Sequence, residues 1–391
     1  MNNSNCRMLA LAPNPWQGQW VNRQRLLSRL GVHYPIVYST GGWFSWDRYD
    51  PAWQSTRFFG GFKLVDNVWV DESPQYLLRF PRISLIDQAV MHLQCRRWKS
   101  WLNSQSKGGA LIAHIFHPIF YPYLKHLRAD FVVYHAYDLF QHTVGWTDKM
   151  AMDERKLLES ADLVIASSQA MADGMFEIVN REIRVLPNGV DVVAFENALQ
   201  PSIQIPSDLQ NIPHPRIGYM GSLHLGVDYD LIYSLAKTEP NWQFVLVGPE
   251  RLLDGERIQS LVKCQSLSNI HFLGEKPYYE IPKYMVNMDV NIMSYLLSDK
   301  TWIKAIYPLK LHEYLAAGKP VVSSDLISVR PFTSVVRIAD GMEDWHKAIG
   351  DALNSGGQGS TEERQAVSRE NSWDARAGQL EKWWCELVHK V

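Results

Sequence analysis

The stretch YPLKLHEYLAAGKPVV, from Tyr307 to Val322, indicates the fold of this chain. Pro308 suits the first turn of a helix, because the N–H that proline lacks has no helical partner there. Gly318 suits a left-handed C-terminal cap, and Pro320 prevents the helix from continuing. The two valines that follow then start a strand. The stretch therefore predicts a short helix that leads into a sheet.

Lys310 falls in the first turn of this expected helix. The free N–H groups and the positive dipole end of a helix N-terminus attract phosphate, and a lysine adds charge there. Glu313 lies one turn further on, where a carboxylate can accept hydrogen bonds from sugar or ribose hydroxyls. The alternative is a solvated lysine and glutamate on an ordinary amphipathic helix.

Composition limits the class of protein. The 391 residues and the hydrophobic content of 46% are enough for two domains with real cores. The net charge of −2 gives no global attraction to nucleic acid or acidic lipid. The four cysteines are widely spaced, which favours reduced thiols in a cytoplasmic protein. No apolar run is long enough to cross a bilayer, so we expect contact with a membrane at most.

Strands and helices alternate twice along the chain, which predicts an α/β protein with two parallel sheets. A polar segment with four prolines, residues 200–215, separates the two alternations and is our predicted linker. We therefore expect an N-terminal domain over 1–199 and a C-terminal domain over 200–371. The last helix, 372–391, is expected to pack back on the N-terminal domain, because its tryptophans need burial.

A basic, tryptophan-bearing segment from Arg96 to Trp101 lies within a predicted helix over residues 87–102. It can be a solvated helix face. Alternatively, it is a surface patch that rests on anionic lipid or on a lipid-linked substrate.

Three motifs together resemble the GT-B glycosyltransferases, above all the large retaining family 4. They are PNGVD at 187–191, GYMGS at 218–222 and EYLAAGKPVV at 313–322. The resemblance implies two doubly wound, Rossmann-like domains that face a central cleft. Two features depart from that family. Ala305 stands where it has the first of two paired glutamates, and Gly221-Ser222 replaces its usual Gly-Arg turn.

The chain resembles more closely a smaller relative, the inverting β-glucuronosyltransferase of the xanthan pathway. That resemblance implies that Asp138, in VYHAYD at 133–138, is the catalytic base. It also implies a donor site for a nucleotide-sugar, to which Glu313 is added by analogy with the larger family. The implied donor-binding residues are Gly221, Ser222, Glu275, Tyr295, Leu309, Lys310 and Glu313.

Residues that follow strands in the N-terminal half are candidates for binding the acceptor. They are Asn14, Trp16 and His117, although His117 can equally be an ordinary loop histidine. The alternative for Asp138 is a helix cap or loop carboxylate. No D-x-D pair follows a strand, so we expect neither an obligatory metal nor another cofactor.

The expected function is transfer of a sugar from a nucleotide-sugar, with UDP as the expected nucleotide. The acceptor would be a hydroxyl of a saccharide or lipid-linked saccharide in bacterial exopolysaccharide or cell-surface glycan synthesis. We expect a cytoplasmic enzyme, peripheral on the inner face of the plasma membrane, that does not bind nucleic acid. The alternatives are a retaining transferase of the family 4 type, a UDP-sugar 2-epimerase on the same fold, and a non-catalytic nucleotide-sugar-binding subunit.

Overall fold

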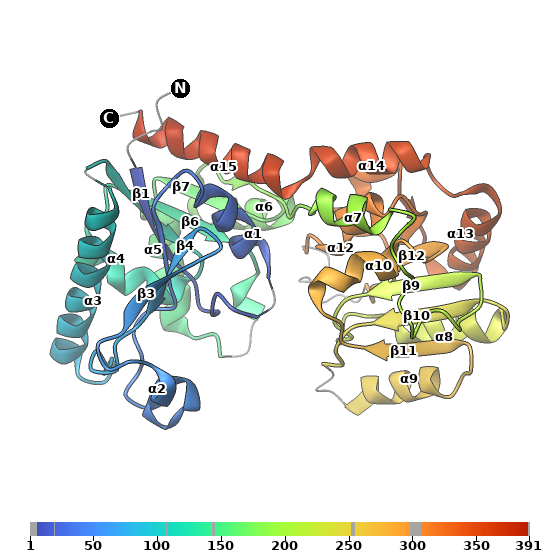
Figure 1. The fold of residues 1–391 in the computed structure, drawn as a ribbon, viewed down its shortest axis with the longest axis horizontal. Coiled ribbons are helices and arrows are strands. Elements are labelled where there is room, and N and C mark those ends of the chain that lie inside the picture. Colours follow the sequence, from blue (N-terminus) through green and yellow to red (C-terminus); the bar gives the residue numbers. More distant parts are fainter. Residues whose placement is uncertain are drawn as a thin grey trace. The chain divides into compact units, whose positions relative to one another are not determined.

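The computed structural model describes residues 6–18, 20–106, 108–142, 145–251, 255–297 and 306–389, except the side chains of 255–258. The chain divides into two compact units (Figure 1). The first unit comprises Met1–Pro187 and Arg376–Val391, and the second comprises Asn188–Ala375.

The first unit is built on an eight-stranded sheet in the order β3-β4-β2-β1-β5-β6-β7-β8. All neighbours are parallel except β3 and β4, which form an antiparallel pair. This parallel arrangement is what the β-α alternation predicts. The strands are β1 (Cys6–Leu11), β2 (Ile36–Ser39), β3 (Gly61–Val65), β4 (Val68–Glu72), β5 (Ala110–Ile115), β6 (Phe131–Ala136), β7 (Leu163–Ala166) and β8 (Arg184–Val185).

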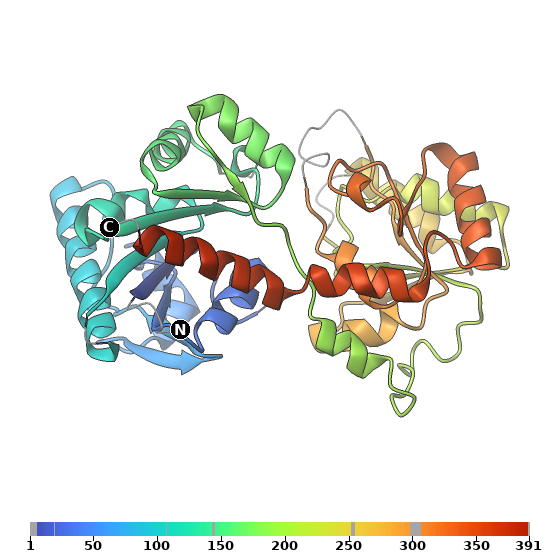
Figure 2. The same cartoon turned by 90° about the horizontal axis from the view of Figure 1, so that it is seen from above.

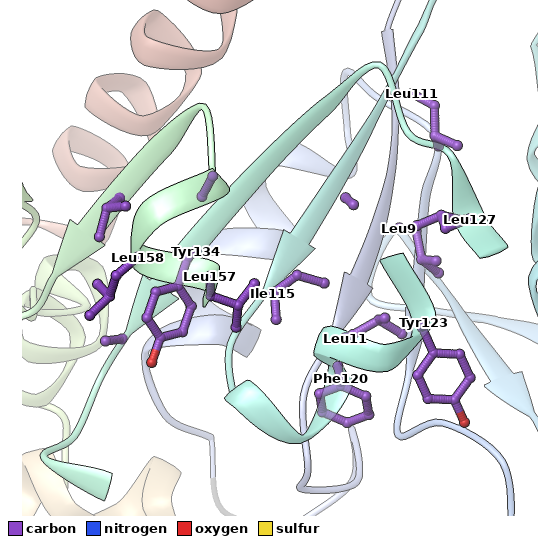
Figure 3. Close-up of a cluster of buried hydrophobic side chains, with 14 of the residues drawn as sticks. Leu9, Leu11, Leu111, Ile115, Phe120, Tyr123, Leu127, Tyr134, Leu157 and Leu158 are labelled. Carbon is purple, nitrogen blue, oxygen red and sulfur yellow. The ribbon is translucent and has the colours of Figure 1, made fainter. Parts of the chain in front are cut away.

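Helices cover both faces of this sheet (Figures 1 and 2). The α-helices are α1 (Asn22–Leu30), α2 (Pro51–Ser55), α3 (Ser84–Gln105), α4 (Tyr121–Leu127), α5 (Asp148–Ser160), α6 (Gln169–Val179) and α15 (Trp373–Val388). The 3₁₀ turns are η1 (Asp47–Tyr49), η2 (Pro118–Phe120) and η3 (Phe140–His142). On the face that carries α3, α4 and α5, buried side chains such as Leu9, Tyr123 and Leu157 form one core (Figure 3).

Helix α15 packs on the first unit. The indole of Trp384 meets the rings of Tyr34 and His114 edge-on, at centroid distances of 6.1 and 5.8 Å. The Tyr34 hydroxyl donates to Glu381 at 2.9 Å. The helix nevertheless begins in the second unit, because the N–H of Trp373 donates to the carbonyl of Val190 and its indole is buried.

The second unit is built on a six-stranded parallel sheet in the order β11-β10-β9-β12-β13-β14. The chain adds strands on one side of β9 and then crosses to the other side with β12. The gap between the ends of β9 and β12 is therefore the topological switch point, where open parallel sheets bind ligands. The strands are β9 (Arg216–Met220), β10 (Gln243–Val247), β11 (Ile270–Gly274), β12 (Val290–Met293), β13 (Val321–Ser323) and β14 (Arg337–Ile338).

Two cores lie on the two faces of this sheet, one under α12 and the other under α8 and α13. The α-helices of the unit are α7 (Val192–Ala198), α8 (Tyr229–Thr238), α9 (Gly255–Gln265), α10 (Ile281–Met285), α12 (Lys310–Ala316), α13 (Gly341–Ser355) and α14 (Thr361–Glu370). The 3₁₀ turns are η4 (Tyr278–Glu280) and η5 (Arg330–Phe332).

The division between the units lies earlier than the sequence predicted. We expected a boundary at 199/200 and a linker over 200–215, whereas the second unit begins at Asn188. Phe195 on α7 is buried in the core of the second unit, as are Leu209 and Ile212 within the expected linker. The polar composition of 200–215 hid these two anchoring side chains.

Candidate active site

A glycine turn lies at the switch point of the second unit. Gly221 directly follows β9 with φ +137°, and its N–H donates to the Val247 carbonyl at 2.9 Å. Gly248, at the end of β10, has φ +151°, and a Cβ on it would lie 2.0 Å from the Gly221 carbonyl oxygen. Only glycine at 248 allows this approach, so the two turns are fixed against each other.

Ser222 completes the turn with a side chain that is unusual for its surroundings. Its Oγ is buried and makes no hydrogen bond in the part of the chain that the structure describes. A buried hydroxyl is normally satisfied, so an unused one at a switch point is available to a ligand.

Lys310 lies against this turn. It is the first residue of α12 and only 8% exposed. Its Nζ lies 2.9 Å from the position that a Cβ on Gly221 would occupy, so the glycine makes room for the ammonium group. Nζ is also 3.6 Å from the centroid of the Tyr219 ring and 5.3 Å from that of Tyr295. A cation over aromatic faces is stabilised by the ring quadrupoles.

Burial controls the protonation of this group. Desolvation lowers the pKa of Lys310 to about 7, and the charge of Glu313 acts in the opposite direction. Burial raises the pKa of the Tyr295 phenol, so that phenol remains a hydrogen-bond donor. The site can therefore supply a titratable cation and a neutral donor.

Two further tyrosines hold α12 in place. The N–H of Met220, the last residue of β9, donates to the Tyr314 hydroxyl at 2.8 Å. The Tyr278 hydroxyl donates to the Glu313 carboxylate at 2.8 Å. Sequence reasoning missed Tyr219 and Tyr278. Tyr219 stands inside the quoted GYMGS motif, whereas nothing in the sequence links Tyr278 to Glu313.

The structure does not unite all the expected donor residues. Lys310 lies against both Gly221 and the Tyr295 ring, and Ser222 is next to Gly221 in the chain. The charge of Glu313 acts on Lys310. Leu309 is the half-buried N-cap residue of α12. Glu275 is exposed and follows the edge strand β11, two strands from β9. Ala305, the position of the missing glutamate, lies outside the described residues.

In the first unit, Asp138 lies at the carboxyl end of β6. Its side chain is exposed, and its Oδ1 accepts a hydrogen bond from the Leu139 N–H at 2.8 Å. Desolvation by neighbouring groups raises the pKa of Asp138 above its usual value, against the opposite effects of that N–H and of His142. An accessible carboxylate with a raised pKa is suited to taking a proton.

His117 is held close to the same turn. Its ring meets Phe140 edge-on at 4.5 Å, and Phe140 meets Tyr137 at 5.1 Å. Its Nδ1 accepts the Ile119 N–H at 3.1 Å, which leaves the proton of a neutral ring on Nε2. Burial and the charge of Arg23 lower the pKa of His117 to about 4. His117 is therefore a neutral donor beside the Asp138 turn.

The prediction that Trp16, in the loop after β1, binds the acceptor is wrong. Trp16 is 2% exposed, and its Nε1 donates to Asp66 at 3.1 Å. An indole that is buried with its N–H in use supports the loop and offers no surface to an acceptor. Asn14 is exposed, while its carbonyl accepts from the Tyr38 hydroxyl at 2.6 Å.

The predicted lipid-contacting segment Arg96–Trp101 is also corrected. Trp98 is fully buried, and its Nε1 donates to Asp71 at 2.6 Å. Arg97 forms an ion pair with the same carboxylate at 2.6 Å, and Lys99 donates to a backbone carbonyl. Trp98 and Arg97 therefore stabilise the packing of α3 on β4, and Lys99 ties α3 to the end of α4, instead of facing a membrane. Among the described residues, no helix combines the length and apolar composition needed to cross one.

Comparison with known proteins agrees with this architecture. Residues 214–354 match the family model described as Glycosyl transferases group 1. These residues contain the whole β9–β12 switch point with Lys310. The chain is a glycosyltransferase of the GT-B fold, as its motifs predicted.

The individual proteins that the chain resembles share less than a third of its sequence. The chain is 28% identical over 282 residues to TuaH of Bacillus subtilis (strain 168), which is named as a teichuronic acid biosynthesis glycosyltransferase; 67% of this chain and 69% of TuaH are covered. Sucrose-phosphate synthase from Thermosynechococcus elongatus superimposes with a TM-score of 0.69 at 16% identity, covering 98% of this chain and 100% of that chain. HepE from Anabaena, in complex with UDP and glucose, superimposes with a TM-score of 0.67 at 15% identity, covering 97% of this chain and 99% of that chain.

Proposed function

We propose that this enzyme transfers a sugar from a UDP-sugar to a hydroxyl of a saccharide or lipid-linked saccharide in bacterial cell-surface polysaccharide synthesis. The observation that carries the proposal is the buried Lys310 against the Gly221–Ser222 turn at the switch point. The UDP bound to HepE and the name of TuaH support the donor and the pathway, respectively.

Each donor-site residue has a proposed role. Lys310 and the Gly221–Ser222 turn bind the diphosphate, and Tyr295 donates a hydrogen bond to the nucleotide. Glu313, held by Tyr278, accepts from the ribose hydroxyls. Leu309 and Glu275 remain proposed contacts through the xanthan-type resemblance. Because Lys310 supplies positive charge to the leaving group, we expect transfer to proceed without a divalent cation.

We further propose that transfer inverts the anomeric configuration. Asp138 takes the proton of the acceptor hydroxyl while the hydroxyl oxygen attacks the anomeric carbon. The bond from that carbon to the diphosphate oxygen breaks, and Lys310 stabilises the charge on the departing UDP. His117, through its Nε2–H, and Asn14 contact the acceptor. Ala305 in place of the first family 4 glutamate weighs against the retaining alternative.

One experiment separates these readings. The full chain is incubated with a UDP-sugar, with and without a saccharide acceptor and with EDTA, and the products are followed by NMR. Our proposal requires acceptor-dependent UDP release and a product anomeric coupling opposite to that of the donor. A retained coupling would return the chain to the family 4 type, and a rearranged sugar formed without acceptor would indicate an epimerase. UDP binding without any turnover would indicate a non-catalytic subunit.

We also propose that the enzyme rests on the membrane through an aromatic surface, defined as Trp46, Tyr49, Phe58, Phe59 and Tyr76. All five side chains are at least half exposed. The rings of Phe58, Phe59 and Tyr76 lie within 5.0–6.2 Å of one another. Exposed apolar and basic side chains accompany them in the sequence, namely Ile83, Leu85, Arg48, Arg57 and Arg82. This mixture suits the interface of an anionic bilayer.

The membrane proposal is tested by co-sedimentation with vesicles of phosphatidylglycerol and phosphatidylcholine. Binding should fall as salt rises, and the double variant Phe58→Ser, Phe59→Ser should bind several-fold more weakly. Met152→Ser, an exposed apolar residue on α5, is the control. Equal binding by the native and double-variant proteins would remove the aromatic surface from the membrane contact.

A further inference from the structure

The first unit contains a buried arginine that pairs with no carboxylate among the described residues. Arg23 on α1 is 2% exposed, and its Nε and Nη1 have no hydrogen-bond partner in the part of the chain that the structure describes. No described carboxylate forms an ion pair with it. A guanidinium stays charged in a protein, and a buried charge without compensation is costly.

Three other buried arginines show how such a charge is normally compensated in this protein. Arg79 donates twice to Asp87, at 2.8 and 2.7 Å. Arg216 donates to the Ile212 carbonyl, and Arg364 donates to several backbone carbonyls that include that of Gly318. Arg23 has neither kind of partner among the described residues. Its guanidinium interacts with the neutral phenols of Tyr38 and Tyr137, which leaves Nε and Nη1 without an acceptor and the charge without a counter-ion.

The surroundings of Arg23 belong to the proposed acceptor region. Its Cζ lies 4.5 Å from the centroid of the Tyr137 ring, and Tyr137 immediately precedes Asp138. Its charge depresses the pKa of both His117 and His135, after the larger effect of burial. Both histidines are therefore neutral near pH 7, and Arg23 is left as the cation of this region.

We propose that Arg23 binds an oxyanion, a carboxylate or a phosphate, that the acceptor carries. The acceptor of this transferase is then an acidic saccharide and not a neutral one. This deepens the proposed function and rests on it, because it assigns the acceptor to the region of Asp138. The anion satisfies the guanidinium donors through charge-assisted hydrogen bonds and fixes the hydroxyl near the base.

The test uses the full chain with saturating UDP at fixed ionic strength. D-Glucuronate, D-glucose 6-phosphate and D-glucose are titrated as probes, and binding is followed by NMR or calorimetry. We expect at least one acidic sugar to bind about tenfold or more tightly than glucose. Comparing the glucuronate and phosphate arms shows which oxyanion the site prefers. Equal binding of all three sugars would overturn the proposal.

Variants assign the preference to Arg23. Arg23→Met should abolish the preference for the acidic sugar, whereas Arg23→Lys should retain part of it. Arg181→Met is the matched control, because Arg181 caps carbonyls at the end of α5, near Leu158 and Ala161. It should keep the full preference. A preference that survives in Arg23→Met would also overturn the proposal, as would a loss of equal size in Arg181→Met.

Two further readouts keep the result decisive. If Arg23→Met does not fold, the binding of acidic and neutral sugars by the native protein and by Arg23→Lys still tests the proposal. If Arg23 had only a structural role, the native protein would show no preference for acidic sugars. UDP binding is measured in every sample. A native protein that fails to bind UDP contradicts the proposed function, whereas normal UDP binding without acidic preference contradicts only the role of Arg23.

Discussion

The candidate sites of the two units are built in different ways. In the second unit, Lys310 contacts Gly221 and the Tyr219 ring at the switch point of one sheet. In the first unit, the candidate residues come from separate elements: an exposed Asp138 follows β6, and a buried Arg23 lies on α1. A nucleotide diphosphate is the same ligand for many enzymes and is bound by a backbone turn and a helix start. An acceptor differs between enzymes and is bound by separate side chains.

If this contrast is correct, the largest effect on rate should come from the first unit. Asp138→Asn keeps the shape of the side chain but removes the proposed base, so single-turnover transfer should slow by about 10²–10⁴-fold. The affinity for UDP should remain unchanged, because Asp138 acts on the acceptor. Asp173→Asn, an exposed carboxylate on α6, is the control and should have the native rate. A near-normal rate in Asp138→Asn would make Asp138 a structural residue.

The largest effect on donor binding should come from Lys310. Lys310→Ala removes a charge-assisted contact worth about 1.5–3 kcal/mol, so UDP should bind roughly 10- to 150-fold more weakly. Uridine, which has no phosphate, should lose little affinity. Calorimetry with both ligands measures the difference, and Lys347→Ala, an exposed lysine on α13, is the control. Equal losses for UDP and uridine would place Lys310 away from the phosphates.

The turn that receives Lys310 can be tested separately. Gly248→Ala places a Cβ 2.0 Å from the Gly221 carbonyl oxygen, at a φ that side chains avoid. We expect a loss of about 1–3 kcal/mol in unfolding free energy and weaker UDP binding. Gly350→Ala on α13, where an added Cβ meets nothing within 4 Å, should be neutral or stabilising by about 1 kcal/mol. Thermal unfolding and UDP titration of both variants decide whether the rigid turn forms the donor site.

The sequence predicted the second unit better for a physical reason. The stretch 307–322 encodes a helix start, a cap and a strand within a few residues, so local chemistry determines where Lys310 lies. In the first unit, an aromatic residue after a strand, such as Trp16, can equally be core, and only packing decides. Arg23 resembled an ordinary polar helix residue until its burial was known. The linker was misplaced because Leu209 and Ile212 are isolated apolar residues in polar surroundings.

The smallest expected effect is the uptake of a proton by Lys310 when UDP binds. The buried Lys310 has a pKa of about 7, below its usual 10.5, so most of it is neutral at pH 8 in the free protein. A bound diphosphate stabilises the charged form, so UDP binding at pH 8 should take up as much as about one proton. Affinity for UDP should accordingly fall as pH rises through 7, whereas uridine should show no such dependence.

Calorimetry in two buffers of different ionisation enthalpy counts this proton directly. Lys310→Arg is the matched control, because a guanidinium stays charged at pH 8 and should bind UDP without proton uptake. The same shift affects folding. The folded state binds fewer protons than the unfolded chain between pH 7 and 10.5, so this lysine makes the free protein more stable as pH rises through that range. UDP binding without uptake in the native protein would mean that Lys310 is already charged before the donor arrives. Lys310 would then carry a permanent charge, like Arg23 in the first unit, and would not be protonated in response to the substrate.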